Sequence, residues 1–269
     1  MKSSLIIVTI FCAASLFAAT PHANDVVLPA SAASQLLIPA AGSIAGANGT
    51  FFHSDITIVN FANHDQNVLL QWLPQGASAT SSMTISIAAQ RALRSTDFVA
   101  EVLAQSGLGS IIITGVTSTG APDPTALLWA SSRIWTPQPG TNGTTSQSLP
   151  AVVMNGLVSG STAALFSVGG GVNADNFRVN VGIVNLASTS QTYAVTLPGN
   201  SGASVSLVVV PAMSMTQVSL GSGLSTAQEV LVQNVTSGST PGPNSWIAYG
   251  STVDNITGDA WSELAVPGQ

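Results

Sequence analysis

Two stretches of the chain alternate apolar and polar positions in the same way. Within residues 52–60 the branched apolar side chains Ile56 and Ile58 stand two positions apart with Thr57 between them, and residues 177–185 repeat the pattern 125 positions later. Alternation with a period of two, together with β-branched residues, is typical of strands that bury one face. We therefore predict two similar units, each built from strands.

Other alternating or apolar runs follow in each unit, separated by Gly, Pro, Asn and Asp rather than by helices. The predicted strands are residues 52–60, 68–73, 83–87, 110–116 and 126–130 in the first unit, and 177–186, 192–197, 203–210, 229–235 and 246–253 in the second. A match between residues 130–134 and 249–253, displaced by 119 positions, extends the repeat. Short strands at this spacing predict an all-β chain of two tandem antiparallel β-sandwich domains of the immunoglobulin-like type.

Two local features interrupt or end these strands. Residues 96–103 predict one or two turns of helix, because a capping residue precedes apolar positions at Phe98 and Val102. Asn60 and Asn185 end equivalent strands, where an Asn side chain can bond its own backbone in a turn. We predict a structural role for both.

The N-terminus has the pattern of an export signal. Lys2 precedes an apolar run, residues 5–17, that is shorter than the roughly 20 residues of a membrane-spanning helix. The predicted organisation is a signal peptide at 1–23, a flexible leader at 24–35, a first sandwich at 36–136, a linker at 137–148 and a second sandwich at 149–269. We expect export to the periplasm, the cell surface or the medium, with no membrane span after cleavage. A retained membrane anchor is the alternative.

The charge inventory narrows the classes of partner. Without the signal, four arginines stand against eleven acidic residues, so the basic surface that nucleic acids require is absent from the sequence. The single cysteine, Cys12, lies in the signal, so we expect no disulfide and domains stabilised by packing alone. Only 6% of the residues are charged, which reduces repulsion between copies. We expect a protein partner or self-association, with a glycan as a further candidate.

The residues that could carry chemistry are few. No Gly-x-Ser-x-Gly motif and no zinc-ligand spacing occurs in the sequence, so we predict no catalytic, cofactor or metal residues and no enzyme activity. His53 corresponds to Arg178 in the second unit, which indicates a tolerant surface position or a divergence for function. Residues 254–259 weakly resemble a calcium loop, but we favour an Asx-rich turn; whether Asp254 and Asp259 bind calcium stays open.

The tryptophans are the remaining candidates for ligand binding. Trp72 and Trp129 lie inside apolar runs, and we predict that both are core residues. Trp135, Trp246 and Trp261 flank loops, where an exposed ring can stack on a sugar. We therefore predict these three as ligand-binding residues.

A family resemblance rests on several motifs of the chain: residues 39–41, 46–49, 52–60, 68–74, 131–133 and 253–259. On them the chain resembles a family of uncharacterised bacterial exported proteins made of tandem β-sandwich modules, and the resemblance covers nearly all of the chain after the signal. It implies no catalytic residues. We expect a non-enzymatic secreted or cell-envelope module acting in binding or assembly through sheet edges, loops or faces. Carbohydrate binding through exposed tryptophans and an accessory role in a secreted hydrolase system are the alternatives.

Overall fold

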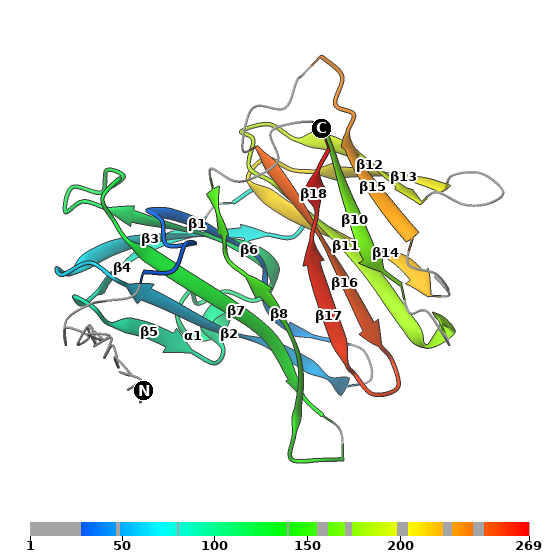
Figure 1. Ribbon diagram of the computed structural model, residues 1–269, viewed down its shortest axis with the longest axis horizontal. Helices are drawn as coiled ribbons and strands as arrows, with labels where there is room; N and C mark the ends of the chain where they lie inside the picture. The colour runs from blue at the N-terminus through cyan, green and yellow to red at the C-terminus, as the bar shows by residue number, and fades with distance from the viewer. Residues whose placement is uncertain are drawn as a thin grey trace, which may run out of the picture.

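The chain forms antiparallel β-sheets arranged in two halves that lie side by side (Figure 1). The computed structural model describes residues 28–46, 49–79, 81–138, 140–154, 161–169, 174–197, 204–222, 228–238 and 245–268. The predicted signal peptide lies outside the described residues. Within these ranges no helix has both the length and the apolar character that crossing a membrane requires.

The first half is a sandwich of two sheets. Its elements are β1 Gln35–Ala45, β2 Phe51–Asn60, β3 Gln66–Pro74, β4 Ser81–Ile87, β5 Ala92–Ser95, α1 Phe98–Glu101, β6 Gly107–Val116, β7 Leu128–Pro137, β8 Thr144–Pro150 and β9 Val152–Val153. Sheet I has the order β4-β3-β6-β1, with β9 paired to β1, and sheet II has the order β5-β2-β7-β8. The end of β1 also pairs with the start of β2, which joins the two sheets at one corner.

Alternation along the strands builds the core between sheets I and II. Ile56 and Ile58 of sheet II point toward Val68 and Leu70 of sheet I, and all four side chains are fully buried in one apolar cluster. Trp72 completes this cluster at 2% exposure, so its predicted core position is confirmed. Burial of one such side chain contributes about 1.5–3 kcal/mol to folding.

The second half is a sandwich of the same kind. Its strands are β10 Thr162–Val168, β11 Phe177–Asn185, β12 Gln191–Leu197, β13 Ser204–Val210, β14 Ser214–Ser222, β15 Gln228–Asn234, β16 Trp246–Asp254, β17 Ala260–Leu264 and β18 Val266–Pro267, with a short 3-10 turn at Ala174–Asn176. Sheet III has the order β13-β12-β15-β10-β18, and sheet IV has the order β14-β11-β16-β17. Their inner faces enclose a second apolar cluster that contains Tyr193 and Trp246.

The strand orders of the two halves correspond one to one. Sheet III repeats sheet I and sheet IV repeats sheet II, strand for strand. Even the register shift in β1 between Ile38 and Ala41 has its equivalent in β10, between Leu165 and Val168. In the immunoglobulin order the seventh strand lies beside the sixth, whereas here β7 lies beside β2 and β6 lies beside β1. The antiparallel sandwich architecture is confirmed; the immunoglobulin-like type is not.

The register corrects one predicted correspondence between the halves. Ile58 pairs with Ala130, and its equivalent Ile183 pairs with Ala248, so these strands correspond at a displacement of 118 and not of 119. The single-residue difference is decisive in a strand, because a slip by one position exchanges the buried and exposed faces. Similarity of side chains alone had matched Ala130 to Tyr249, which points to the opposite face.

Two segments that we expected to lack strand structure are hydrogen-bonded into the first half. Half of the expected linker, residues 137–148, belongs to β7 and β8, which pair with each other. In the expected flexible leader, Ala33 forms two backbone hydrogen bonds with Leu128, of 2.8 and 3.0 Å. The side chains of these segments are polar or small and show no strand pattern. The sequence pattern therefore did not predict these pairings, which are made by the backbone.

One buried asparagine stabilises the same corner of each half. Asn60 is fully buried, and its Nδ2 donates to the carbonyl oxygens of His64, Ile87 and Ala88 at 2.8–3.2 Å. Asn185 is equally buried and donates to the equivalent oxygens of Thr189, Val210 and Pro211 at 2.8–3.1 Å. Each Oδ1 accepts a backbone N–H two residues later. The predicted structural role therefore extends beyond the local turn to the end of a neighbouring strand.

The predicted helix is present as the short element α1. It begins after Asp97, whose side chain makes no capping hydrogen bond to the helix backbone. The carboxylate instead accepts hydrogen bonds from the side chains of Ser43 and His53. Asp97 therefore fixes α1 against β1 and β2 rather than capping it.

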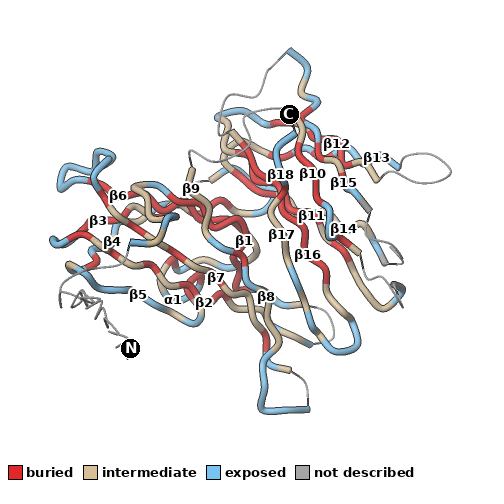
Figure 2. Tube along the Cα trace, viewed as in Figure 1, coloured by how far each residue is buried: buried red, intermediate tan, exposed pale blue. Residues whose placement is uncertain are grey.

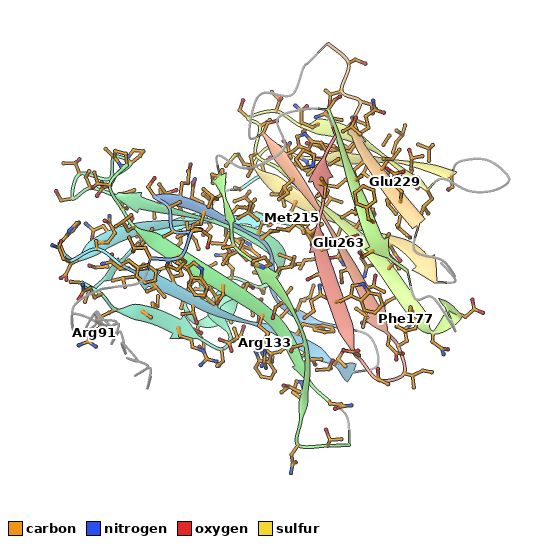
Figure 3. All side chains as sticks on the ribbon, in the orientation of Figure 1. Arg91, Arg133, Phe177, Met215, Glu229 and Glu263 are labelled. Carbon is orange, nitrogen blue, oxygen red and sulfur yellow. The ribbon has the colours of Figure 1, made fainter. Side chains whose placement is uncertain are left out.

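A third apolar cluster joins the two halves. It contains Leu37 and Ile112 from the outer face of sheet I, and Val184, Met215 and Tyr249 from the outer face of sheet IV. Figure 2 shows buried segments both inside each half and where the halves meet, and Figure 3 shows Met215 at this meeting point. The halves are thus packed on each other through a true core.

Close approach and backbone hydrogen bonds complete this interface. The ring of Tyr249 lies across Gly182, where an added Cβ would come within 2.1 Å of ring carbons. The turn after β3 pairs with β14, since the N–H groups of Gly76 and Ala79 donate to the carbonyl oxygens of Met215 and Met213, both at 2.9 Å. Such directional contacts fix one orientation of the halves.

Candidate binding surfaces

The outer face of sheet III is an exposed apolar surface. The inward side chains of β13, Val208 and Val210, belong to the core. The alternate side chains Val205, Leu207 and Val209 are 56%, 71% and 63% exposed. Among the described strands β13 pairs only with β12, so it is also an edge of the sheet. We call the outward side chains of sheet III the sheet III face.

The sheet III face extends beyond the edge strand. Phe166 of β10 and Val266 of β18, toward the opposite edge of the sheet from β13, are 52% and 54% exposed. Glu229 of β15, labelled in Figure 3, is its only charged side chain among the described residues. No described segment covers the face. Contiguous exposed apolar surface of this kind marks an interaction site more often than isolated apolar residues do.

A cleft lies between the halves beside their shared core. The β1–β2 and β7–β8 hairpins form one wall, and the outer face of sheet IV with the β16–β17 hairpin forms the other. Its volume is about 580 Å³. Its polar lining includes Thr136, Gln147, Asn180, Gln217 and Arg178. No local pattern in the sequence indicated this cleft, because its walls come from separate segments of the two halves.

The three tryptophans predicted to bind ligands lie in different surroundings. Trp246 is fully buried against Tyr193, with ring centroids 5.1 Å apart, so the expectation that it is exposed is wrong. Its strand enters the core directly from the loop, and proximity to a loop did not imply exposure. Trp135 and Trp261 are on separate halves, and the structure does not bring them together.

The two remaining tryptophans are held by hydrogen bonds. Trp135 stacks on His53 at a centroid distance of 4.7 Å, and its Nε1 donates to the carbonyl oxygen of Thr96 at 2.9 Å. Trp261 is 36% exposed, and its Nε1 donates to the carbonyl oxygen of Ser167 at 2.9 Å.

Trp129 departs from its predicted core position. It is half-buried on the outer face of sheet II, opposite Val59. The run of apolar residues around it favoured burial, but its place in the alternation of β7 directs it outward.

His53 and Arg178 occupy equivalent outward positions but have different partners. His53 Nδ1 lies 2.7 Å from Asp97 Oδ2, and Ser43 Oγ donates to the same oxygen at 3.2 Å. A nucleophilic relay needs the imidazole between the hydroxyl and the carboxylate; here the carboxylate lies between the other two groups. The arrangement is therefore a structural tie between β1, β2 and α1.

Residues 254–259 form the turn between β16 and β17. Asp254 accepts hydrogen bonds from the Ile256 N–H at 2.8 Å and from Thr257 Oγ1 at 2.7 Å, which lower the pKa of its carboxyl group. Asp259 Oδ1 accepts the N–H of Ala260 at 3.0 Å. These contacts are those of an Asx-rich turn. Across the described ranges, no three His, Cys, Asp or Glu side chains come together as a metal site would need.

The sequence matches no protein-family model, and a search of curated proteins found no significant match. The case for function therefore depends on the surfaces of the molecule itself.

Proposed function

We propose that this protein is a non-enzymatic, exported assembly module that binds a second copy of itself through the sheet III face. The observation that carries the proposal is the exposure of three neighbouring apolar side chains on β13. Their equivalents on β4 are Ser82, Thr84 and Ser86, which are exposed and polar. The edge strand of this sheet can therefore carry a hydrophilic outer face, as β4 does, whereas β13 carries an apolar one. Export is supported by the N-terminal signal pattern.

The packing between the two halves supports a second copy of the chain as the partner that covers the sheet III face. On sheet I the outward residues Leu37 and Ile112 are covered by a sheet of the same chain. Their equivalents on sheet III are Ala164 and Leu231, by the matching registers of the two sheets. On sheet I, the face equivalent to the sheet III face is therefore already covered by another sheet of this chain, sheet IV.

Charge also favours association between copies. A face with Glu229 as its one described charge imposes little repulsion on a second identical face. Two copies related by a two-fold axis can pack sheet III on sheet III, which places the same residues on both sides of the interface. The outer face of sheet II is less suitable, because it carries the Asp55–Arg94 ion pair.

Analytical ultracentrifugation from low to high micromolar concentration tests this proposal. We expect dimers of the chain without its signal, and at least a ten-fold weaker association for Leu207→Asp. Thr84→Asp, at the equivalent position of β4, is the matched control and should associate normally. A monomer at every concentration, or equal association of Leu207→Asp and the parent, contradicts the proposal.

Carbohydrate binding is a second candidate at one position only. Trp261 combines an exposed ring with an aromatic neighbour, Phe177, at 5.7 Å between centroids. A change of tryptophan fluorescence with a glycan, lost in Trp261→Ala, would support it. An unchanged spectrum across a panel of glycans would eliminate it.

A further inference from the structure

We propose that the cleft between the halves binds a small hydroxylated carboxylate, such as a sugar acid, with Arg178 holding the carboxylate. This inference does not depend on self-association, because the cleft lies at the opposite sheet of the second half from the sheet III face. A volume of about 580 Å³ is within the range of small-molecule sites.

Arg178 has the position and the spare hydrogen-bonding capacity that the proposal requires. It is half-buried, and removal from water lowers the pKa of its guanidinium, which still remains charged at neutral pH. Its one hydrogen-bond partner among the described residues is an uncharged oxygen, Asn255 Oδ1. A guanidinium carries five N–H donors in a planar fork that matches a carboxylate. By contrast, Arg94 already holds Asp55 through two hydrogen bonds of 2.9 and 2.7 Å.

Asp254 also lines the cleft, but it forms no ion pair with Arg178. Both oxygens of Asp254 accept hydrogen bonds within their own turn. The ion pairs of the described residues are His53–Asp97 and Asp55–Arg94, and neither includes Arg178. A half-buried cation without a carboxylate partner is costly to maintain, and an anionic ligand would offset that cost.

The neutral lining supplies groups for hydroxyls on the same ligand. Asn180 makes no side-chain hydrogen bond to any described residue, and the Nε2 groups of Gln147 and Gln217 have none either. Their Oε1 atoms accept from Ser251 and Tyr249, at 2.9 and 3.1 Å, which directs the amide nitrogens elsewhere. Thr136 Oγ1 is buried, lines the cleft and lacks a hydrogen-bond partner. Unsatisfied buried polar groups are rare and call for a ligand or water.

An apolar portion of the cleft gives the carbon skeleton a surface to contact. Ile44, Phe52 and Ile134 line it alongside the polar groups. The lining thus combines one cation, a carboxylate that is hydrogen-bonded within its own turn (Asp254), several neutral hydrogen-bonding groups and an apolar wall, and this set suits an acid with hydroxyl groups. It does not suit a polyphosphate, which requires several cations.

The test is isothermal titration calorimetry with glucuronate and galacturonate, using glucose and galactose as uncharged counterparts. It is done on the Leu207→Asp variant, so that self-association cannot mask or mimic binding. We expect at least one uronate to bind, the sugars to bind at least ten-fold more weakly, and Arg178→Gln to lose at least ten-fold in affinity. Arg178→Lys should retain an intermediate affinity, because it keeps the charge without the planar fork.

Arg91→Gln is the matched control, since Arg91 is an exposed arginine outside the cleft. It should bind like the parent, and thermal melting without ligand should show that every variant is folded. The proposal is overturned if neither uronate binds at 20 mM, if the sugars bind equally well, or if folded Arg178→Gln binds like the parent. None of these outcomes bears on the dimer, so the two proposals fail separately.

Discussion

The outer faces of sheets II and IV are built from equivalent strands but meet different surroundings. On sheet II the face is open to solvent and carries Asp55, Arg94 and Arg133. On sheet IV the equivalent positions, by the strand registers, are Asn180, Gln217 and Ser251. At these three positions the charged groups of sheet II are thus replaced by neutral ones on the face that packs against the other half, where Arg178 is the charged side chain that β11 directs outward.

The residues at the centre of the two faces differ in their exposure to solvent. Met215, Ile247 and Tyr249 of sheet IV are 0%, 4% and 1% exposed. Their equivalents Ala92, Trp129 and Ser131 are exposed or half-buried. A buried charge without a partner is far more costly than a buried amide or hydroxyl that keeps its hydrogen bonds. The comparison therefore teaches that one strand framework can become either a surface or an interface through the residues on its outer face.

The strongest test introduces a charge at one position of each face. Met215→Asp buries a carboxylate in the cluster between the halves and should lower the free energy of unfolding by about 3–5 kcal/mol. Ala92→Asp, its equivalent on sheet II, should change it by less than about 0.5 kcal/mol. Urea unfolding followed by tryptophan fluorescence measures both. Equal effects would mean that the interface does not persist in solution.

Removing the shared asparagines tests what the halves have in common. Asn60→Ala and Asn185→Ala each remove four hydrogen bonds of a fully buried side chain, three donated to carbonyl oxygens and one accepted from a backbone N–H, so each should cost about 3 kcal/mol. Asn63→Ala, in an exposed turn, is the control and should have little effect. The same urea experiment applies, and a large loss in one half only would show that the two corners are not energetically equivalent.

A single methyl group probes the close approach of the halves. Gly182→Ala would place its Cβ within 2.1 Å of the Tyr249 ring, and displacing that ring should cost about 1–3 kcal/mol. The equivalent residue of sheet II is Thr57, which already carries a side chain, and Thr57→Ala should be nearly neutral. Thermal melting compares them; an unchanged melting temperature for Gly182→Ala would contradict the packing of Tyr249.

The smallest expected effect concerns the ion pair on sheet II. Hydrogen bonds from Arg94 lower the pKa of Asp55, so the folded state favours the carboxylate. This contribution is present above the unfolded-state pKa of about 3.9 and is lost as the pH falls through the lower folded-state value. Asp55→Asn should therefore flatten the acid limb of the stability curve slightly, and Arg94→Gln should do the same. If neither changes urea midpoints between pH 6 and pH 2, the pair contributes nothing measurable.

The sequence predicted strands well where alternation was strong. The predicted run at residues 52–60 is β2 at 51–60, and the run at 192–197 is β12 at 191–197. The strands that were not predicted include the polar strand β8, the proline-containing strand β1, and also β5, β9, β10, β14, β17 and β18. In β1, Pro39 stands at a register shift, where a missing N–H is tolerated. Strands of this kind are defined by their backbone partners, which local pattern does not report.

The candidate sites were less predictable than the strands. The pattern Ser204–Val210 indicated a strand, but only its edge position made three of its side chains a surface. The repeat aligns His53 with Arg178, a lining residue of the cleft, and so indicates a position where the two halves differ. The surroundings of Arg178 could not be inferred, because they come from several segments of both halves.

The sequence by itself determined that the chain is built from strands with alternating faces and that one pattern occurs twice. Those properties follow from the period of two and from the absence of long helical segments, both of which are local. Only the tertiary structure decided which outer face became an interface, which tryptophan was buried and where a cleft opened. These depend on contacts between segments that are distant in the sequence, whose free energies no local pattern of hydrophobic and polar residues contains.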